Sequence, residues 1–528
     1  MIRVARIPPA GLLLLLALAF YLPGVLSPRD FTVADEARYA EVLREMMHGG
    51  HWIVPYLNGA YYADKPPLYF WLAAGVSHLL GGITPLSFLL VTWIGAAGSI
   101  WVTYRLGLAI FSRRAAFIGA LLLMSTFVFV ACAQFVRMDM MMCFFIALAF
   151  LFFHRGLARE QPAQYYGFYI ASALAVLSKG PLGFLIPFLS ALGFLVQRKR
   201  WRALRQWVFH WGLALFVVLV GGWLVAAWRL GEQEFVKDIF GRQIVGRALR
   251  SSVQRQPFYF YALVLPFVLL PWSPFLIRAA RNALRTAGEG VGLLLAWFVA
   301  GFVVISAISG KLFIYLLPMM PPLLLIVGSF VDDLWERRTS GSGCLRAEGM
   351  AAVVLTFGII SLVPLAASKI PMAASLPLWP LAALFLPVTI LGVVLSWSGR
   401  PKALVVTLVA GMWLFSAYAF QVLVPRVNDL CSARSIGKDI AGRLENGGSV
   451  ASLHVQRGIL DFYAEAVIPD VSDAELATYL EAPRHFVVLS EKEFRRRPWL
   501  GQRFSTLAGY YIVDRRYLIV GGTGRLSE

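Results

Sequence analysis

GLLLLLALAFYLPGVL, residues Gly11–Leu26, is an apolar run without a single charged side chain. Similar runs recur as far as about residue 422, and many approach the roughly 20 apolar residues that a helix needs to cross a bilayer. A cleaved signal peptide would explain this first run alone. No small-x-small cleavage site follows it, however, and further spans come later, so we predict an uncleaved first membrane helix.

Composition agrees with a chain that crosses the membrane many times. Hydrophobic residues make up 59% of the 528 positions and charged residues only 15%. Soluble proteins carry about a quarter charged residues, so an ordinary soluble fold is excluded. Helices are expected because the backbone must satisfy its own hydrogen bonds in lipid. We predict thirteen spans, at 10–27, 85–110, 114–131, 140–156, 164–178, 181–197, 207–229, 258–278, 291–308, 312–330, 350–368, 377–397 and 402–422.

The charges of the connecting loops predict the orientation. Every second loop is rich in arginine and lysine, as in Arg105/Arg113/Arg114, Arg155/Arg159 and Arg198–Arg205. The positive-inside rule places these loops in the cytoplasm and needs no chemistry from them beyond anchoring. The N-terminus is then cytoplasmic, and an odd number of spans places the C-terminus outside.

The outer loops keep a few cations against this bias. The short ones carry Arg137, Lys179, Lys311 and Lys369, and two long loops cover 28–84 and 230–257. The middles of the spans are almost free of ionisable residues. Polar chemistry is therefore expected at the outer boundary of the membrane.

ADEARYAEVLREM, Ala34–Met46, holds six charged residues directly after the first span. On a helix, Asp35 and Arg38 share a face with the apolar side chains of Tyr39, Val42 and Met46. An interfacial helix would present such a face to the membrane. A salt-bridged surface helix, with Asp35 favoured by the helix dipole, explains the same pattern.

Four further segments place charges at breaks in the outer loops. They are AYYADKPPLYFWL with Lys65, FVRMDMMM with Asp139, LSKGPLGFLIP with Lys179 and SGKLFIYLLPMMP with Lys311 and Tyr315. Simpler explanations exist: the aromatic residues can anchor in the headgroup belt, and an aspartate at a helix start can be a cap.

The cations of these loops suggest a common ligand. Arginine binds phosphate in a bidentate manner and lysine binds it as a point charge. Convergence of the outer cations would create a site for a phospholipid-like anion, with carboxylates beside it to act as a base or to orient a sugar. The cations in question are Arg38, Lys65, Lys179, Arg247 and Lys311.

DEARYAEVLREM, DKPPLYFW, RMDM, SKGP and SGKLFIYLLP together resemble the motifs of the bacterial polyprenyl-phosphate-sugar glycosyltransferases of the GT-C fold. The chain is most similar to the lipid A 4-amino-4-deoxy-L-arabinose transferase family, which is related to the protein O-mannosyltransferases. The resemblance implies a membrane all-α fold of about thirteen spans with outer interfacial helices, plus a small C-terminal α/β domain. It also implies inverting sugar transfer from undecaprenyl phosphate on the periplasmic side of the bacterial inner membrane.

The resemblance assigns roles by motif. Asp35 is expected to be the principal catalytic carboxylate and Asp139 a second functional acid. Arg38 and Lys65 are expected to bind the donor or acceptor phosphate. The other substrate-binding residues are Lys179 and Arg247 as phosphate ligands, Tyr315 lining the lipid cavity, and Lys311.

Two departures from the family pattern concern the loops. Asp64 stands where some relatives have glutamate, and a histidine that could help bind a metal in the loop 230–257 is absent, with Arg242 nearby. We therefore predict no metal or other cofactor.

The composition changes near residue 425. Residues 425–528 hold 14 Lys/Arg and 13 Asp/Glu, so the net charge of +19 belongs almost wholly to the membrane part. Strand-like runs (449–455, 485–490, 516–522) alternate with helical patterns (433–445, 473–481), which predicts a periplasmic α/β domain after a membrane domain of residues 1–424. A lid, an acceptor-docking surface and a passive cap all remain open for it. EKEFRRRPW (491–499) is interpreted as a solvated or headgroup-facing patch, and no nucleic-acid partner is expected.

The expected partners are a sugar donor linked to undecaprenyl phosphate, lipid A or another acceptor, and membrane lipids. Transfer of another sugar, such as mannose, to protein or to a different surface glycan is an alternative within the class. A lipid transporter or flippase is the alternative outside it, but transporters hold substrate near the midplane on repeated, broken helices. Here the charges lie at the outer boundary, and the sequence contains no visible repeat.

Overall fold

The computed structural model describes residues 8–32, 35–208, 210–230, 233–239, 241, 256–285, 288–336, 342–369, 376–512 and 515–522. The chain forms two compact units. We call the first the membrane unit (Met1–Ser27, Ala63–Tyr69 and Phe88–Leu423) and the second the α/β unit (Pro28–Tyr62, Phe70–Ser87 and Val424–Glu528).

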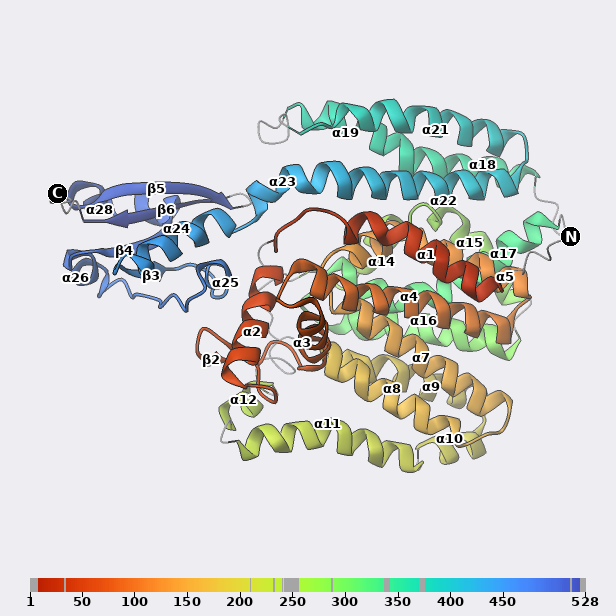
Figure 1. Cartoon of the computed structure of the whole chain (residues 1–528). Coiled ribbons are helices and arrows are strands. Elements are labelled where there is room, and N and C mark those ends of the chain that lie inside the picture. Colours follow the sequence, from red (N-terminus) through yellow and green to blue (C-terminus); the bar gives the residue numbers. More distant parts are fainter. Residues whose placement is uncertain are drawn as a thin grey trace, which may run out of the picture. The chain divides into compact units, whose positions relative to one another are not determined.

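The regular elements of the membrane unit are all helices in its described residues, as the apolar runs predict (Figure 1). Its helices are α1 (Pro9–Val25), α4 (Pro85–Ile110), α5 (Arg113–Met124), α6 (Phe127–Gln134), α7 (Asp139–Ala158), α8 (Gln164–Lys179), α9 (Leu182–Gln197), α10 (Trp201–Val208), α11 (Trp211–Arg229), α12 (Gln233–Asp238), α14 (Phe260–Val268), η2 (Ser273–Phe275), α15 (Leu276–Arg285), α16 (Glu289–Ala307), η3 (Phe313–Met319), α17 (Met320–Trp335), α18 (Ser342–Val353), η4 (Val354–Gly358), α19 (Ile359–Ala367), α21 (Trp379–Trp397), α22 (Pro401–Tyr418) and η5 (Ala419–Leu423).

Ten of the thirteen predicted spans coincide with apolar segments long enough to cross a bilayer. Among the described residues, eight helices qualify singly and two more as bent pairs, α5 with α6 at 62° and α14 with η2–α15 at 116°. The other three predicted spans, 10–27, 164–178 and 181–197, fall on α1, α8 and α9. These have 17, 16 and 16 residues and are at the short end for a span. The total of thirteen therefore stays a prediction, whereas an integral membrane protein is confirmed.

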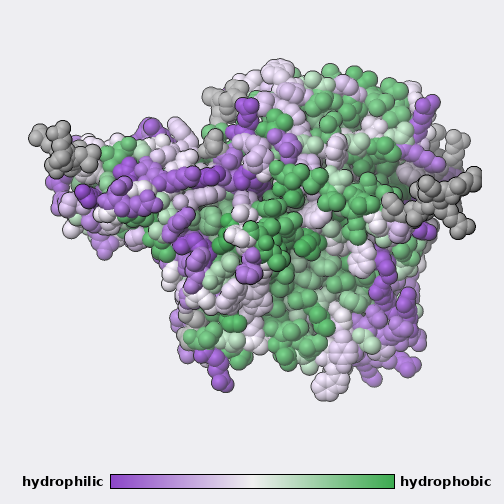
Figure 2. Space-filling model, viewed as in Figure 1, coloured by the Kyte–Doolittle hydropathy of each residue, from purple (hydrophilic) through white to green (hydrophobic). Residues whose placement is uncertain are grey.

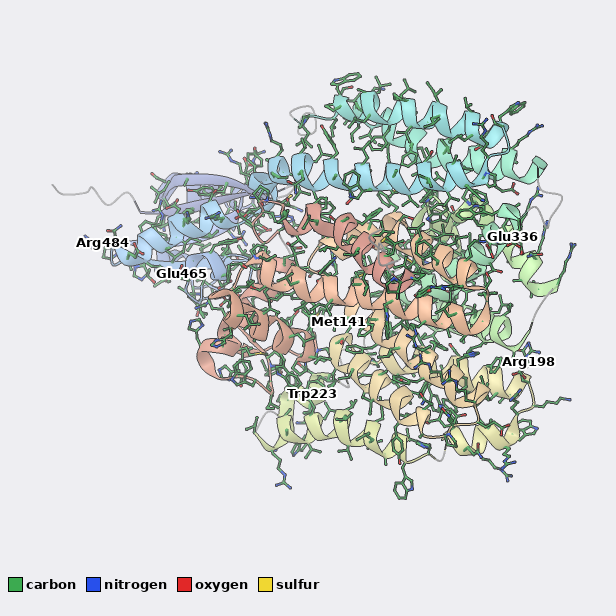
Figure 3. The ribbon with its side chains drawn as sticks, turned by 45° about the vertical axis from the view of Figure 1, so that its right-hand side comes forward. Met141, Arg198, Trp223, Glu336, Glu465 and Arg484 are labelled. Carbon is green, nitrogen blue, oxygen red and sulfur yellow. The ribbon has the colours of Figure 1, made fainter. Side chains whose placement is uncertain are left out.

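Small residues and stacked rings pack the membrane helices closely. Gly119 on α5 faces Gly328 on α17, and a Cβ on Gly328 would lie 2.5 Å from the Gly119 Cα, so only glycine permits this approach. Phe150 on α7 stacks on Trp297 of α16 with ring centroids 3.9 Å apart. Outward-facing apolar side chains dominate the middle of the visible face of these helices, and hydrophilic residues gather toward its edges, including the end on the right (Figure 2). The end on the right carries Arg198 and Glu336, whereas Trp223 lies toward the other end (Figure 3).

The α/β unit contains a four-stranded sheet with the strand order β3-β4-β6-β5. β3 and β4 are parallel and the remaining pairs are antiparallel. The predicted strands and both predicted helices are confirmed. The elements are α2 (Asp35–Gly49), β1 (Tyr56–Leu57), β2 (Ala60–Tyr61), most of α3 (Leu68–Leu80), α23 (Val424–Cys431), α24 (Arg434–Glu445), β3 (Ser449–Leu453), α25 (Asp461–Ala464), α26 (Leu476–Glu481), β4 (His485–Ser490), α27 (Glu491–Arg495), α28 (Pro498–Arg503), β5 (Ser505–Ile512) and β6 (Arg515–Gly521).

The sheet has an apolar layer on both faces. Val488 of β4 points into a cluster with Ile436 and Ile440 of α24. Its neighbours Val487 and Leu489 point to the opposite cluster, as the two-residue period of a strand requires. The small α/β fold expected for the C-terminal part is confirmed, and loop residues 28–62 form one compact unit with it.

Candidate active site

Asp35 begins helix α2, and Arg38 follows one turn later on the same side. Their nearest charged atoms, Arg38 Nη2 and Asp35 Oδ1, are 3.9 Å apart. The Asp35 side chain is 43% exposed and that of Arg38 is 13% exposed, whereas Val42 and Met46 farther along the face are buried. The predicted amphipathic helix is confirmed, and its carboxylate is accessible to a ligand.

Two glutamates of α2 that the sequence pattern directs away from this face are buried instead. Glu36 pairs with Arg29 and accepts hydrogen bonds from the Thr32 backbone N–H (3.0 Å) and hydroxyl (2.9 Å). Glu41 accepts two hydrogen bonds from Arg44, at 2.7 and 2.6 Å. The spacing of residues along a helix cannot predict buried carboxylates. A carboxylate is buried where hydrogen-bond or ion-pair partners compensate for its lost hydration, and spacing does not reveal those partners.

The C-terminal part of the chain holds α2 and its neighbouring hairpin through Asp461. Its carboxylate accepts hydrogen bonds from the Asn58 side chain (2.8 Å) and from the backbone N–H groups of Gly458 (3.0 Å) and Ile468 (2.8 Å). Gly458 has φ +76°, and a Cβ there would lie 3.0 Å from Arg38 Cγ. The backbone at Gly458 therefore packs directly against the candidate phosphate-binding arginine.

Glu41 makes the folding stability of the α/β unit depend on pH. Burial raises the pKa of its carboxyl from 4.5 to about 7, and Arg44 offsets this rise only in part. The folded chain then keeps a proton that the unfolded chain releases, so stability falls as the pH rises between these two values. We expect the Tm of the full-length protein to fall over this window, and Glu41→Gln to flatten the fall.

The matched control for this experiment is Glu465→Gln, which changes an exposed carboxylate of the same unit. Its Tm-against-pH curve should follow the wild type. A Glu41→Gln curve parallel to the wild type would show that Glu41 stays ionised in the folded chain.

A second group of predicted residues lies in the membrane unit. Asp139 is the first residue of α7, and its carboxylate pairs with the Lys179 ammonium at the last residue of α8. Their side chains are only 4% and 14% exposed. The cap residue of α7 is Met138, so Asp139 forms an ion pair instead of the simple cap that the sequence left open.

Tyr315 completes this cluster. The Lys179 Nζ lies 5.2 Å from the centroid of the Tyr315 ring, within cation–π range. The following residue, Gly180, has φ +120°, which turns the chain sharply after Lys179 and confirms the predicted break. Because an ammonium has three N–H donors, Lys179 can keep Asp139 and still donate to a phosphate.

Thr92, which sequence reasoning missed, connects two more of the motifs. Its hydroxyl hydrogen-bonds the Tyr69 hydroxyl at 2.7 Å and accepts from the Arg137 backbone N–H at 3.3 Å. Tyr69 belongs to the segment that carries half-buried Lys65, and Arg137 precedes Asp139. Within the membrane unit, the Lys-Pro-Pro and Arg-Met-Asp motifs therefore meet at the start of α4.

Among the predicted cations that the structure describes, Lys311 is the most buried. It is 4% exposed, and its ammonium donates to the backbone carbonyls of Gln256, at 3.3 Å, and Ile308. These contacts tie the end of the long outer loop to the start of η3. The remaining predicted ligand, Arg247, lies outside the described residues. Within the described ranges, no three His, Cys, Asp or Glu side chains gather as a metal site.

Known proteins resemble this chain in sequence and in fold. Residues 64–225 match the family model described as dolichyl-phosphate-mannose-protein mannosyltransferase. An uncharacterized protein of Aquifex aeolicus is 26% identical over 82% of both chains. The undecaprenyl phosphate-alpha-4-amino-4-deoxy-L-arabinose arabinosyl transferase 1 of Proteus mirabilis is 28% identical, over 61% of this chain and 59% of its own length. The match thus spans about three fifths of that transferase.

The whole fold has a counterpart among solved structures. The crystal structure of ArnT from Cupriavidus metallidurans bound to undecaprenyl phosphate superposes with a TM-score of 0.78, covering 97% of this chain and 98% of that one at 22% identity. This likeness shows the GT-C fold for the chain, and the named relatives are glycosyltransferases of the GT-C class. Within this class the chain is similar to the undecaprenyl-phosphate aminoarabinose transferases, as its motifs indicate.

Proposed function

We propose that this chain transfers 4-amino-4-deoxy-L-arabinose from undecaprenyl phosphate to a phosphate of lipid A, at the periplasmic face of the bacterial inner membrane. The observation that supports this most is the Asp139–Lys179–Tyr315 cluster at the ends of membrane helices. It offers a nearly buried cation where a phosphate on a lipid tail would reach the protein. The similarity to named aminoarabinose transferases supports the choice of donor.

Each of the proposed site residues has a role in the sugar-transfer reaction. The bond between sugar C1 and the donor phosphate breaks, and its electron pair leaves with undecaprenyl phosphate. Lys179 and Lys65 stabilise the negative charge that grows on this phosphate, and Arg38 holds the donor or acceptor phosphate. An acceptor phosphate oxygen attacks C1 from the opposite face, which inverts the anomeric configuration.

Asp35 acts on the sugar in this scheme. A lipid A phosphate is already an anion and has little proton to give up, so a general base is not required. The carboxylate instead stabilises the positive character that develops on the sugar and fixes its position. With a hydroxyl acceptor, as in protein O-mannosylation, the same carboxylate would remove the hydroxyl proton.

Mannose transfer to protein is the second candidate, because the matching family model carries that description. Tyr315 and the lipid-binding cations would serve either donor equally, since both donors present a phosphate on a polyprenyl chain. The donor sugar and the acceptor therefore need a direct chemical test.

Mass spectrometry of lipid A provides this test. We expect an aminopentose on lipid A from cells that express the chain and make the donor, and none from cells that lack it or carry Asp35→Asn. Glu465→Gln, which changes an exposed carboxylate, should leave the modification intact. Unmodified lipid A in every strain, with protein and donor both detected, would exclude this acceptor. A mannosylated protein in the expressing strain alone would then favour the second candidate.

A further inference from the structure

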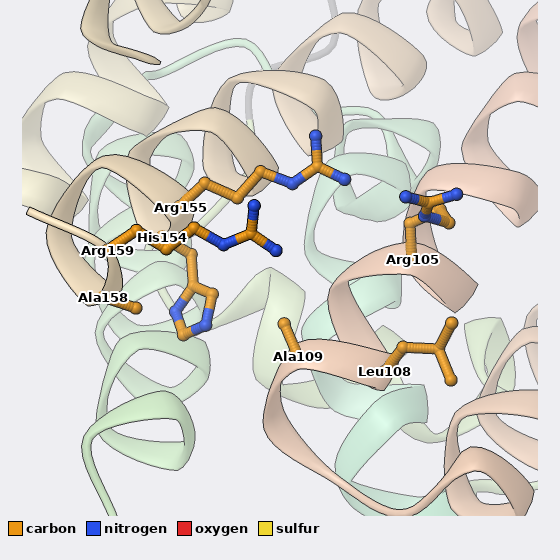
Figure 4. A pocket seen from close by; sticks show the side chains of 7 residues that line it. All are labelled: Arg105, Leu108, Ala109, His154, Arg155, Ala158 and Arg159. Atoms are coloured by element: carbon orange, nitrogen blue, oxygen red, sulfur yellow. The ribbon is translucent and has the colours of Figure 1, made fainter. Parts of the chain in front are cut away.

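A shallow hollow lined by arginines lies at the far end of α7 from Asp139. Arg105, Leu108 and Ala109 of α4 line it together with His154, Arg155, Ala158 and Arg159 at the end of α7 (Figure 4). Its volume is about 310 Å³. Its first lining residue on α7, His154, follows Asp139 by 15 positions, so roughly 22 Å of helix separates the hollow from Asp139, and it is distinct from the candidate active site.

Arginines close to this hollow form ion pairs with carboxylates, whereas the three arginines that line it do not, within the described residues. At the same end of the membrane unit, Arg114 pairs with Asp332 and Glu336, Arg200 with Glu289, and Arg278 with Glu348. Across the described part of the chain, no ion pair involves Arg105, Arg155 or Arg159. Glu289 lies in electrostatic range of His154, but it is held by Arg200.

The positive-inside rule accounts for arginines at this end, and the negative end of a helix dipole favours one cation per helix. Neither effect explains why arginines from two helices surround one hollow without a carboxylate among them. His154 of α7 and Ala109 of α4 line the hollow from its two sides. The hollow is thus a cationic site with one wall on each of two helices.

We propose that Arg105, Arg155 and Arg159 bind the phosphate headgroup of an anionic phospholipid in the cytoplasmic leaflet. Arginine is the side chain best suited to bidentate contact with phosphate oxygens. Leu108, which is 39% exposed, and the exposed Ala109 and Ala158 provide an apolar wall beside the arginines. A lipid has both an anionic head and acyl chains for such a wall, whereas a soluble phosphate would use the arginines alone.

Native mass spectrometry of the full-length protein, released from nanodiscs of phosphatidylglycerol and phosphatidylcholine, tests this site. Wild type should retain phosphatidylglycerol in preference. The triple variant R105Q/R155Q/R159Q should lose this retention by roughly tenfold to a hundredfold, since each cation near a membrane surface contributes about fivefold. The single variant Arg155→Gln removes one charge, leaves the topology signals nearly intact, and should lose about fivefold.

The control removes three exposed arginines elsewhere in the predicted cytoplasmic loops, R113Q/R202Q/R205Q, and should lose clearly less retention than the test triple variant. Equal losses in both triple variants would show general surface attraction and overturn the proposal. Unchanged retention in Arg155→Gln and the test triple would also overturn it. So would loss of the lipid from wild type on addition of millimolar inorganic phosphate, because that result describes a site for a soluble anion.

Discussion

Asp35→Asn is expected to lower kcat by about a hundredfold to thousandfold, the usual loss when one group that stabilises transition-state charge is removed. The replacement keeps the size of the side chain and removes the negative charge that stabilises positive character on the sugar. The effect should appear in kcat more than in KM, because this charge develops in the transition state. Turnover of the purified full-length protein with a saturating donor measures it.

The exposure of Asp35 makes this result easy to interpret. Its side chain is 43% exposed and stands 3.9 Å from Arg38, and exposed pairs of this kind contribute roughly 0.2–1 kcal/mol to stability. We therefore expect the Tm of Asp35→Asn to stay close to that of wild type. A variant with unchanged Tm and unchanged kcat would remove Asp35 from the catalytic step.

Lys179→Met is expected to lower both the folding stability and the transfer activity of the protein. It leaves the Asp139 carboxylate 96% buried and without its cation, and breaking a buried ion pair in this way typically costs about 3–5 kcal/mol. The loss of one preorganised donor to the leaving phosphate should cost roughly 3 kcal/mol more in the transition state. Thermal unfolding in detergent and turnover measure the two effects separately.

The double variant Asp139→Asn/Lys179→Met separates a structural role from a functional one. Removing both charges leaves no unpaired ion, so much of the stability should return. Activity should not return, because the cation for the phosphate is still missing. A double variant that recovers stability and transfers sugar at the wild-type rate would show that the pair serves folding alone.

The sequence predicts the local features of this molecule well. Asp35 opens α2, Asp139 opens α7 and Lys179 ends α8, since each position combines a charge or glycine break with the end of a regular pattern. These signals are local, so a single sequence contains them. The mixed α/β character of the C-terminal part is predictable for the same reason.

The missed features depend on contacts between distant segments. Asn58 and Asp461 are 403 residues apart, and neither has a distinctive spacing. The role of Thr92 is visible only in the structure, where its hydroxyl contacts Tyr69 and the backbone of Arg137, which belong to two separate segments. β5 was missed because most of its residues are partly or fully exposed, which weakens the apolar alternation.

The α/β unit gains a specific role from these contacts. Sequence patterns left a lid, a docking surface and a passive cap open for the C-terminal part. The hydrogen bonds of Asp461 and the close approach of Gly458 to Arg38 instead support the segment that carries the proposed catalytic carboxylate. We interpret this part of the chain as a support that positions α2.

Transfer by the purified full-length protein tests the central claim most directly. The protein, undecaprenyl-phosphate-linked 4-amino-4-deoxy-L-arabinose and lipid A would be combined in detergent, and both products followed by mass spectrometry. We predict equal amounts of aminopentose-modified lipid A and free undecaprenyl phosphate with wild type, inverted anomeric configuration in the product, and formation of both products at least about a hundredfold slower with Asp35→Asn. An intact donor after prolonged incubation with folded wild-type protein and lipid A would contradict the account.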